Sequence, residues 1–218
     1  HIPFNKPPSI NDSRVFINEA LDSGMLAGRG PYTKKCEEWL IAKHPKIEGA
    51  LLTTSCTHAL EVSALLMNLC ADDEVIVPSY TFVSSALAYH MQGAKLRFCD
   101  IRKDTLNIDE TLLEKIITKN TKAILPTQLN GRVANMDEVC KIADEYNLQV
   151  YEDSAQALGA QYKGKSAGSF GLGGCISFYP AKVLGCFGDG GAVLTNNDDI
   201  YSQIKLMRDH GREDDGNI

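Results

Sequence analysis

At 218 residues, with 44% hydrophobic and 23% charged residues, the chain has the size and composition of a globular domain with one sizeable core. Its formal net charge of −6 and its lack of any cluster of lysine and arginine argue against a nucleic-acid-binding protein. No apolar run is long enough to span a membrane, and the first ten residues, HIPFNKPPSI, have no apolar signal-peptide core, so we expect neither a membrane nor a nucleic-acid partner.

The first 45 residues differ from the rest of the chain. Two helical patterns, at residues 13–23 and 33–43, are joined by the glycine-rich turn GMLAGRGP (24–31). We therefore expect an N-terminal helical arm over residues 1–45 and one larger domain over residues 46–218. The turn either connects the two helices or forms an interface or substrate loop.

From about residue 50 onward, short apolar runs alternate with longer amphipathic patterns. This alternation is typical of an α/β protein with three layers, α/β/α, in which helices cover both faces of a mostly parallel sheet. The last two strands have no long helix between them, so we expect them to pair through a reversed strand. The expected strands are residues 50–54, 74–78, 95–100, 122–127, 148–153, 175–180 and 191–196, and the expected helices are 57–70, 81–93, 108–118, 135–147 and 198–211.

Seven cysteines and five histidines are scattered along the chain, without the C-x-x-C or H-x-x-x-H spacings of common metal sites. An odd number of cysteines fits reduced thiols better than a framework of disulfides. We expect a cytoplasmic protein with no bound metal.

The stretch TTSCTHAL (53–60) is the first of three candidate sites, each at the end of a predicted strand, where sheets of this kind bind ligands. Here the strand runs into the N-terminus of a helix, whose free N–H groups and dipole favour an anion such as a phosphate. Ser55 and Thr57 either belong to such a site or only cap the helix.

Carboxylates and a lysine follow two later strands. In VYEDSAQALGA, Glu152 and Asp153 point to opposite faces, so a single carboxylate is left either to hold a cationic atom or to cap a helix. In SFYPAKVLGCFGDGG, Ser177 and Lys182 follow a strand, and the glycines after them allow close backbone approach.

A phosphate site, a carboxylate and a lysine on one edge of a sheet are the groups that pyridoxal 5′-phosphate needs. The lysine forms a Schiff base with this cofactor. The carboxylate keeps the pyridine nitrogen protonated, so that the ring accepts electrons. Phe82 comes just after the strand 74–78, in position to cover the face of the ring. The sequence therefore predicts pyridoxal 5′-phosphate as the cofactor.

Long motifs along the chain strengthen this prediction. IPFNKPP, LLTTSCTHALE, VPSYTFVSSA and DTLNIDE in the first part, and EDSAQALGAQYKGKSAGSFG and SFYPAKVLGCFGDGGAVLTN in the second, resemble the DegT/DnrJ/EryC1/StrS family of sugar-nucleotide aminotransferases. The first part is most similar to the dTDP-4-amino-4,6-dideoxygalactose transaminases of that family, and the second resembles the wider family, 3-aminotransferases included. The resemblance implies the large domain of fold type I pyridoxal-phosphate enzymes.

The resemblance also implies a role for individual residues. Some members have histidine at the position of the catalytic lysine and perform dehydration, so a lysine here argues against that branch. The implied set is Lys182 for the Schiff base, Asp153 for the pyridinium nitrogen, Gln156 beside the phenolic oxygen, Phe82 stacked on the ring, and Ser177, Thr57 and the amides of Cys56 and His58 for the phosphate.

The implied reaction moves an amino group from L-glutamate, through the pyridoxamine 5′-phosphate form of the cofactor, to a keto group of a nucleotide-linked deoxysugar. The C4 keto group of dTDP-4-keto-6-deoxyglucose is favoured and a C3 keto group is an alternative. The product would serve the biosynthesis of a cell-surface polysaccharide or another glycan, and the enzyme would be a homodimer.

Two departures from the family pattern bear on this reading. Many members read VHLYG where this chain reads TQLNG (127–131), so Gln128 and Asn130 are expected near the substrate. Family chains continue with a C-terminal small domain, whereas this chain stops at REDDGNI, so we expect that domain to be absent from it. An inactive truncated large domain and a different pyridoxal-phosphate chemistry, such as dehydration, remain alternatives.

Overall fold

A computed structural model describes residues 1–3, 10 and 12–212 of the chain. Most of the IPFNKPP motif and the last six residues of REDDGNI therefore lie outside the described residues. None of the helices in the described part combines the length and the apolar character needed to cross a membrane.

The core of the fold consists of two four-stranded sheets, β1-β10-β9-β6 and β3-β2-β4-β5, which continue each other through β6 and β5. The strands β5 and β6 are two parts of one strand that is interrupted only at Tyr151, and bonds from Tyr151 N to Ile124 O and from Asp153 N to Pro126 O join the two halves of the sheet. The strands of the sheet are β1 (Gly49–Thr53), β2 (Glu74–Pro78), β3 (Lys95–Cys99), β4 (Thr121–Ile124), β5 (Gln149–Val150), β6 (Glu152–Asp153), β9 (Gly173–Ser177) and β10 (Gly191–Thr195).

Strand direction follows the predicted pattern. β2 pairs in parallel with β3 and β4, β4 with β5, and β6 with β9. β10 runs antiparallel to both of its neighbours, with Gly191 opposite Ser177 on β9 and Thr53 on β1. The expected reversed strand is confirmed. Because it starts where β9 ends, it brings the loop between them to the carboxyl-end edge of the sheet.

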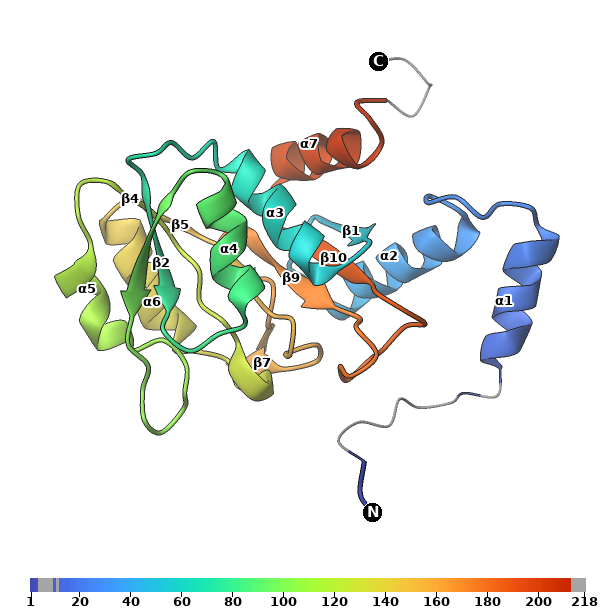
Figure 1. The fold of residues 1–218 in the computed structure, drawn as a ribbon, viewed down its shortest axis with the longest axis horizontal. Coiled ribbons are helices and arrows are strands. Elements are labelled where there is room, and N and C mark those ends of the chain that lie inside the picture. The colour runs from blue at the N-terminus through green and yellow to red at the C-terminus, as the bar shows by residue number, and fades with distance from the viewer. Residues whose placement is uncertain (4–9, 11, 213–218) are drawn as a thin grey trace.

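Helices cover both faces of the sheet, which confirms the three layers (Figure 1). Side chains alternate along each strand. Val75 and Val77 of β2 pack under α3 and α4, whereas Ile76 packs on the opposite face against α5 and α6. The helices are α1 (Ser13–Asp22), α2 (Pro31–Lys43), α3 (Cys56–Leu66), α4 (Val83–Met91), α5 (Leu113–Ile116), α6 (Met136–Glu145) and α7 (Asp198–Arg208), with 3₁₀ turns η1 (Glu110–Leu112) and η2 (Leu129–Gly131).

Local sequence explains where several helices begin. α2 has Pro31 at its first position, where a missing N–H costs nothing. α7 is capped by Asn197, whose side chain accepts a hydrogen bond from Ile200 N, and it has Asp198 in its first turn and Arg208 in its last. Both charges complement the helix dipole.

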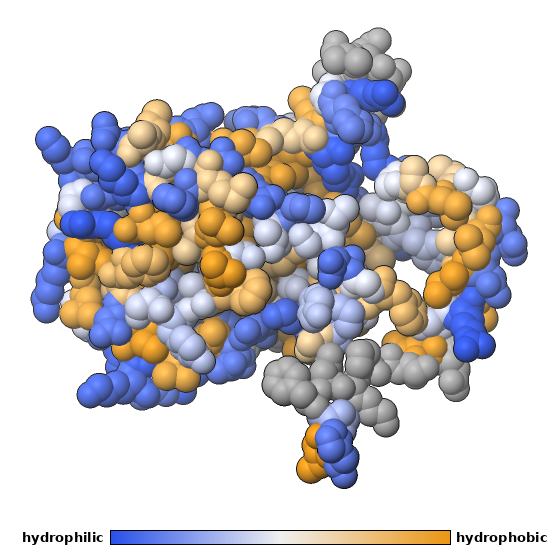
Figure 2. Space-filling view, in the orientation of Figure 1, coloured by the Kyte–Doolittle hydropathy of each residue, from blue (hydrophilic) through white to orange (hydrophobic). Residues whose placement is uncertain are grey.

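The two N-terminal helices differ in their contacts. Leu40 of α2 is 1% exposed and packs with Ala50 and Ile176 on the sheet. α1 buries no side chain and stands beside the body of the molecule (Figure 1). Its exposed Phe16 and Leu21 belong to the hydrophobic surface that this helix presents (Figure 2).

The structure differs from the prediction in two places. The helix expected over residues 108–118 is a 3₁₀ turn followed by the single turn of α5, because Asp109 caps η1 and Ile117 has extended backbone. A hairpin of β7 (Gln161–Tyr162) and β8 (Lys165–Ser166) was not predicted. Its turn residues Lys163 and Gly164 both have positive φ, as tight hairpins require.

Gly171 lies where the loop before β9 passes against β5. Its φ is +55°, and a Cβ there would come within 2.4 Å of Val150 O. We expect Gly171→Ala to lower the free energy of unfolding by about 3 kcal/mol or more, because a clash with the backbone adds to the strain of the left-handed conformation. The matched control is Gly164→Ala, with φ +77° and no atom within 4 Å of a new Cβ. It should cost only about 1–2 kcal/mol in urea denaturation, and equal costs for the two variants would contradict the expectation.

Candidate cofactor site

The N-terminus of α3 forms one end of the candidate site. Ser55 caps the helix, and its Oγ accepts a hydrogen bond from His58 N at 3.1 Å. The backbone ladder of the helix starts with Ala59 N, which donates to Ser55 O. The N–H groups of Cys56 and Thr57 precede that ladder and are the donors suited to an anion. The amide of His58, expected among the phosphate ligands, is instead used by the cap.

Gly191 packs closely on this helix end. The residue begins β10 directly against the turn into α3, and a Cβ on it would lie 2.4 Å from Cys56 N and from Ser55 C. Only glycine fits there, so the two strands approach the helix start closely. Ser177, predicted as a phosphate ligand, is the partner of Gly191 in the register of β9 and β10 and therefore lies on the same edge.

The start of α4 lies beside the start of α3. Thr57 Oγ1 donates to Ser84 Oγ at 2.9 Å, which joins the first turns of the two helices. Phe82 is the N-cap residue of α4 and is 69% exposed. The ring predicted to cover the cofactor is thus an exposed side chain at the same end of the sheet.

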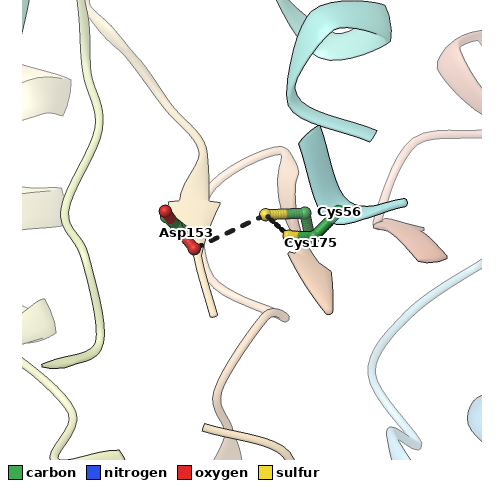
Figure 3. Close-up of side chains that lie close together, drawn as sticks. All are labelled: Cys56, Asp153 and Cys175. Carbon is green, nitrogen blue, oxygen red and sulfur yellow. Dashed lines mark hydrogen bonds between the residues drawn. The ribbon is translucent and has the colours of Figure 1, made fainter. Parts of the chain in front are cut away.

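Asp153 is the buried charge of the site, at 4% exposure. Its Oδ2 accepts a hydrogen bond from Ser85 Oγ, and its Oδ1 accepts from Ala155 N at 3.0 Å. Cys175 Sγ lies 3.7 Å from Asp153 Oδ1, and Cys56 Sγ lies 3.2 Å from Cys175 Sγ. Two thiols therefore lie beside the carboxylate (Figure 3). A buried carboxylate needs such donors.

The same three side chains have donor atoms within 4.8 Å of one another, a spacing that could also suit a metal ion. A thiophilic ion requires thiolates. Burial, and next the hydrogen bond from Cys56, raise the pKa of the Cys175 thiol well above its usual value. The Cys175 thiol therefore stays protonated and donates to Asp153, which favours a cationic organic group over a metal as the partner of this carboxylate.

A chain of hydroxyls holds the other side of Asp153. Thr81 Oγ1 lies 2.8 Å from Ser85 Oγ and 2.8 Å from Thr127 Oγ1, so hydrogen bonds run from the loop after β4 to the carboxylate. Sequence reasoning did not identify these three residues. The available signal was the run of hydroxyl side chains in SYTFVSS, which follows a strand.

Glu152 points to the opposite face of the sheet, as strand alternation predicted. It is fully buried, with Oε1 accepting from Phe170 N at 2.7 Å and Oε2 accepting from Gln128 Nε2 at 2.5 Å. Burial raises the pKa of Glu152 to about 7. Gln128 is also fully buried, and its Oε1 accepts from Ala134 N at 2.7 Å. The amide of Gln128 is therefore used inside the protein, and the expectation that this position lies near the substrate stays a prediction.

Lys182 lies in a turn after β9. Its backbone N–H donates to Tyr179 O, and Cys186 N donates to Phe178 O, so the loop folds back on itself. A Cβ on Gly185 would lie 2.9 Å from Pro180 Cα, which explains the glycine in this loop. Within the described ranges the amino group of Lys182 has no recorded hydrogen bond or ion pair.

The predicted residues come from separate elements of one sheet edge. Cys56 and Asp153 meet through Cys175, and Ser177 meets the start of α3 through Gly191. Gln156 is held from another side, since its Oε1 accepts from Asn130 N at 2.7 Å. Among the described residues, no recorded bond joins Lys182 or Gln156 to the other members of the set.

Comparison with known proteins gives a consistent result. The model of the DegT/DnrJ/EryC1/StrS aminotransferase family matches residues 10–217. The chain is 42% identical over 168 residues to the UDP-2-acetamido-2-deoxy-3-oxo-D-glucuronate aminotransferase of Pseudomonas aeruginosa. That alignment covers 76% of this chain and 47% of the relative.

Solved structures share the fold. DesV of S. venezuelae, in complex with a ketimine intermediate, has a TM-score of 0.83 and 36% identity, over 92% of this chain and 54% of that one. A GDP-4-keto-6-deoxymannose-3-dehydratase with a trapped PLP-glutamate geminal diamine has a TM-score of 0.91 and 29% identity, over 97% and 56%. The large-domain fold of the fold type I pyridoxal-phosphate enzymes is confirmed. The chain spans about half the length of the relatives it matches.

Ser85 donates a buried side-chain hydrogen bond to Asp153. We expect Ser85→Ala to lower the free energy of unfolding by about 1–3 kcal/mol, because a buried carboxylate oxygen loses its hydroxyl donor. Ser79→Ala is the matched control: Ser79 Oγ donates at 3.4 Å to Asp100 on the surface. That variant should change stability by less than about 0.5 kcal/mol in the same denaturation experiment. A Ser85 variant as stable as the control would contradict this role.

Glu152 makes the stability of the fold depend on pH. Its ordinary pKa of 4.5 rises to about 7 in the folded chain. Between these values the folded state holds a proton that the unfolded state releases, so the contribution of Glu152 to stability falls as pH rises. Glu152→Gln removes this dependence. The variant should therefore gain stability relative to the wild type between about pH 5 and about pH 7 in urea titrations, and a constant difference across that range would contradict the expectation.

Proposed function

Because the chain belongs to the DegT/DnrJ/EryC1/StrS aminotransferase family, we propose that it is the large domain of a pyridoxal-phosphate-dependent enzyme that transfers an amino group from L-glutamate to a keto group of a nucleotide-linked sugar. The observation that carries the proposal is the buried Asp153 carboxylate. It ends a strand next to β9, the strand that leads to Lys182. A carboxylate in this position would fix a pyridinium nitrogen.

The residues present fit the cofactor at both ends. The N–H groups of Cys56 and Thr57 at the start of α3, with the hydroxyl of Ser177, suit the phosphate. The hydroxyl and thiol donors around Asp153 keep a carboxylate in a fixed position for the ring nitrogen. Pyridoxal 5′-phosphate, when bound, supplies the electron sink and carries the amino group between the two substrates.

The chain's own side chains then have distinct roles. Lys182 Nζ would bind the cofactor covalently and, once released, would take the proton from Cα of the amino donor and deliver it to the cofactor. Asp153 holds the proton of the ring nitrogen. Phe82 covers the exposed face of the site and excludes water from it.

The position of the keto group is part of this proposal. The motifs of the first half of the chain favour a C4 keto group, as in dTDP-4-keto-6-deoxyglucose, for the synthesis of a cell-surface polysaccharide or another glycan. The P. aeruginosa relative is named for a 3-oxo sugar nucleotide, which supports C3 as the alternative. We further propose a cytoplasmic homodimer. A dehydratase resembles the chain in fold, but the lysine at position 182 favours amine transfer.

Lys182→Ala tests the proposal. The wild-type protein should develop a visible absorption band with pyridoxal 5′-phosphate and convert L-glutamate and a keto-sugar nucleotide to 2-oxoglutarate and an amino sugar. The variant should lose the band and at least about 10²–10⁴-fold of the rate, because it lacks the amine to which we assign the proton transfer. Product analysis with 3-keto and 4-keto substrates identifies the carbon.

Lys163→Ala is the matched control, since that lysine lies on the exposed turn of the β7–β8 hairpin and pairs with Asp137. It should keep both the band and the rate. A wild-type protein without the band, or a Lys182 variant that retains it, would overturn the proposal.

A further inference from the structure

Gln156 is held in one orientation by the backbone of the neighbouring loop. Asn130 N–H donates to Gln156 Oε1 at 2.7 Å. A backbone N–H only donates, so the oxygen of the side-chain amide must face Asn130 and its NH₂ group must face away. The amide therefore offers a donor, and not an acceptor, on the side away from the loop.

The loop that supplies this N–H is a tight turn. In η2 Asn130 has φ +54° and Gly131 has φ +77°, and a Cβ on Gly131 would lie 3.3 Å from Gln156 O. Leu129 N donates to Asn107 Oδ1 at 3.1 Å. The turn thus lies against the segment that carries Gln156, and its position depends on the bonds that hold its two ends.

The side chains of Gln128 and Glu152 fix the start of that turn. The side chain of Gln128 joins the backbone at Ala134 to the side chain of Glu152, since its Oε1 accepts from Ala134 N at 2.7 Å and its Nε2 donates to Glu152 Oε2 at 2.5 Å. The backbone N–H of Gln128 donates to Asp153 O at 2.8 Å. Both side chains are fully buried, and Phe170 N satisfies the second oxygen of Glu152.

We propose that Gln128 and Glu152 are positioning residues that aim the NH₂ group of Gln156 into the site, where it donates to the phenolic oxygen of the cofactor. This inference rests on the proposed function. It gives a role to the fully buried side chains of Gln128 and Glu152. It also says which end of the Gln156 amide, the NH₂ group, faces the site. A hydrogen-bond donor at the phenolic oxygen stabilises the ionised form of that oxygen. The nitrogen that links Lys182 to the cofactor then binds a proton less tightly.

The test is the pH midpoint of the visible band of the protein loaded with pyridoxal 5′-phosphate, together with the dissociation constant of the cofactor. Gln156→Glu keeps an acceptor for Asn130 N–H but presents no donor to the site. Gln128→Leu keeps the volume of the side chain but removes its bonds to Ala134 and Glu152. Each variant should raise the midpoint by about 0.5–1 pH unit, the size expected for the loss of one hydrogen bond.

A double-mutant cycle separates positioning from general destabilisation. In the background Gln156→Leu, the further change Gln128→Leu should leave the midpoint where Gln156→Leu alone has put it. Gln161→Leu makes the same chemical change at an exposed position of β7 and should leave the midpoint at its wild-type value. If Gln128→Leu does not fold, Glu152→Gln weakens the same bond and should give a smaller shift in the same direction.

The outcomes distinguish this inference from the function on which it rests. If the wild-type protein binds the cofactor through Lys182 but Gln156→Glu leaves the midpoint unchanged, the assignment of a donor at Gln156 is overturned. The aminotransferase proposal then still stands. Equal effects of Gln128→Leu with and without Gln156 would overturn the positioning role. Failure of the wild type to bind the cofactor would overturn both.

Discussion

Two adjacent carboxylates at the end of the central strand are the constraint on which the rest of the molecule depends. Alternation along β6 sends Glu152 and Asp153 to opposite faces of the sheet, and both are buried. A buried carboxylate is costly unless donors surround it. A different set of hydrogen-bond donors surrounds each carboxylate. Glu152 accepts from a peptide N–H and a side-chain amide, and Asp153 accepts from a hydroxyl, a peptide N–H and a thiol.

These two donor sets organise the loops at the carboxyl end of the sheet. Around Asp153 they join the starts of α3 and α4, and the start of β10 packs closely against the N-terminus of α3. Around Glu152 they tie the turn after β4 to the loop before β9. The proposed chemistry thus uses one face, where Asp153 would hold a cationic ring, while the opposite carboxylate, Glu152, supports the loops that border it.

Sequence alone was sufficient wherever the signal was local. The apolar runs located the strands, the absence of a helix before residue 191 predicted the reversed strand, and alternation separated Glu152 from Asp153. It was insufficient where a residue's role depends on a distant partner. Ser85 lies 68 positions from Asp153, and Gln128 lies 24 from Glu152, so neither contact leaves a periodic pattern. The bond from Gln128 to Glu152 was not predicted for this reason: an amide in a strand-end loop looks the same in sequence whether it faces a ligand or a buried carboxylate.

The central claim is that this edge of the sheet binds pyridoxal 5′-phosphate through Lys182. The most direct measurement is reduction of the cofactor-loaded protein with borohydride, which makes the link to the lysine permanent, followed by peptide mapping by mass spectrometry. The account predicts a phosphopyridoxyl group on Lys182 and on no other residue at stoichiometric cofactor. A modified lysine elsewhere in the chain, or no modified peptide at all, would contradict it.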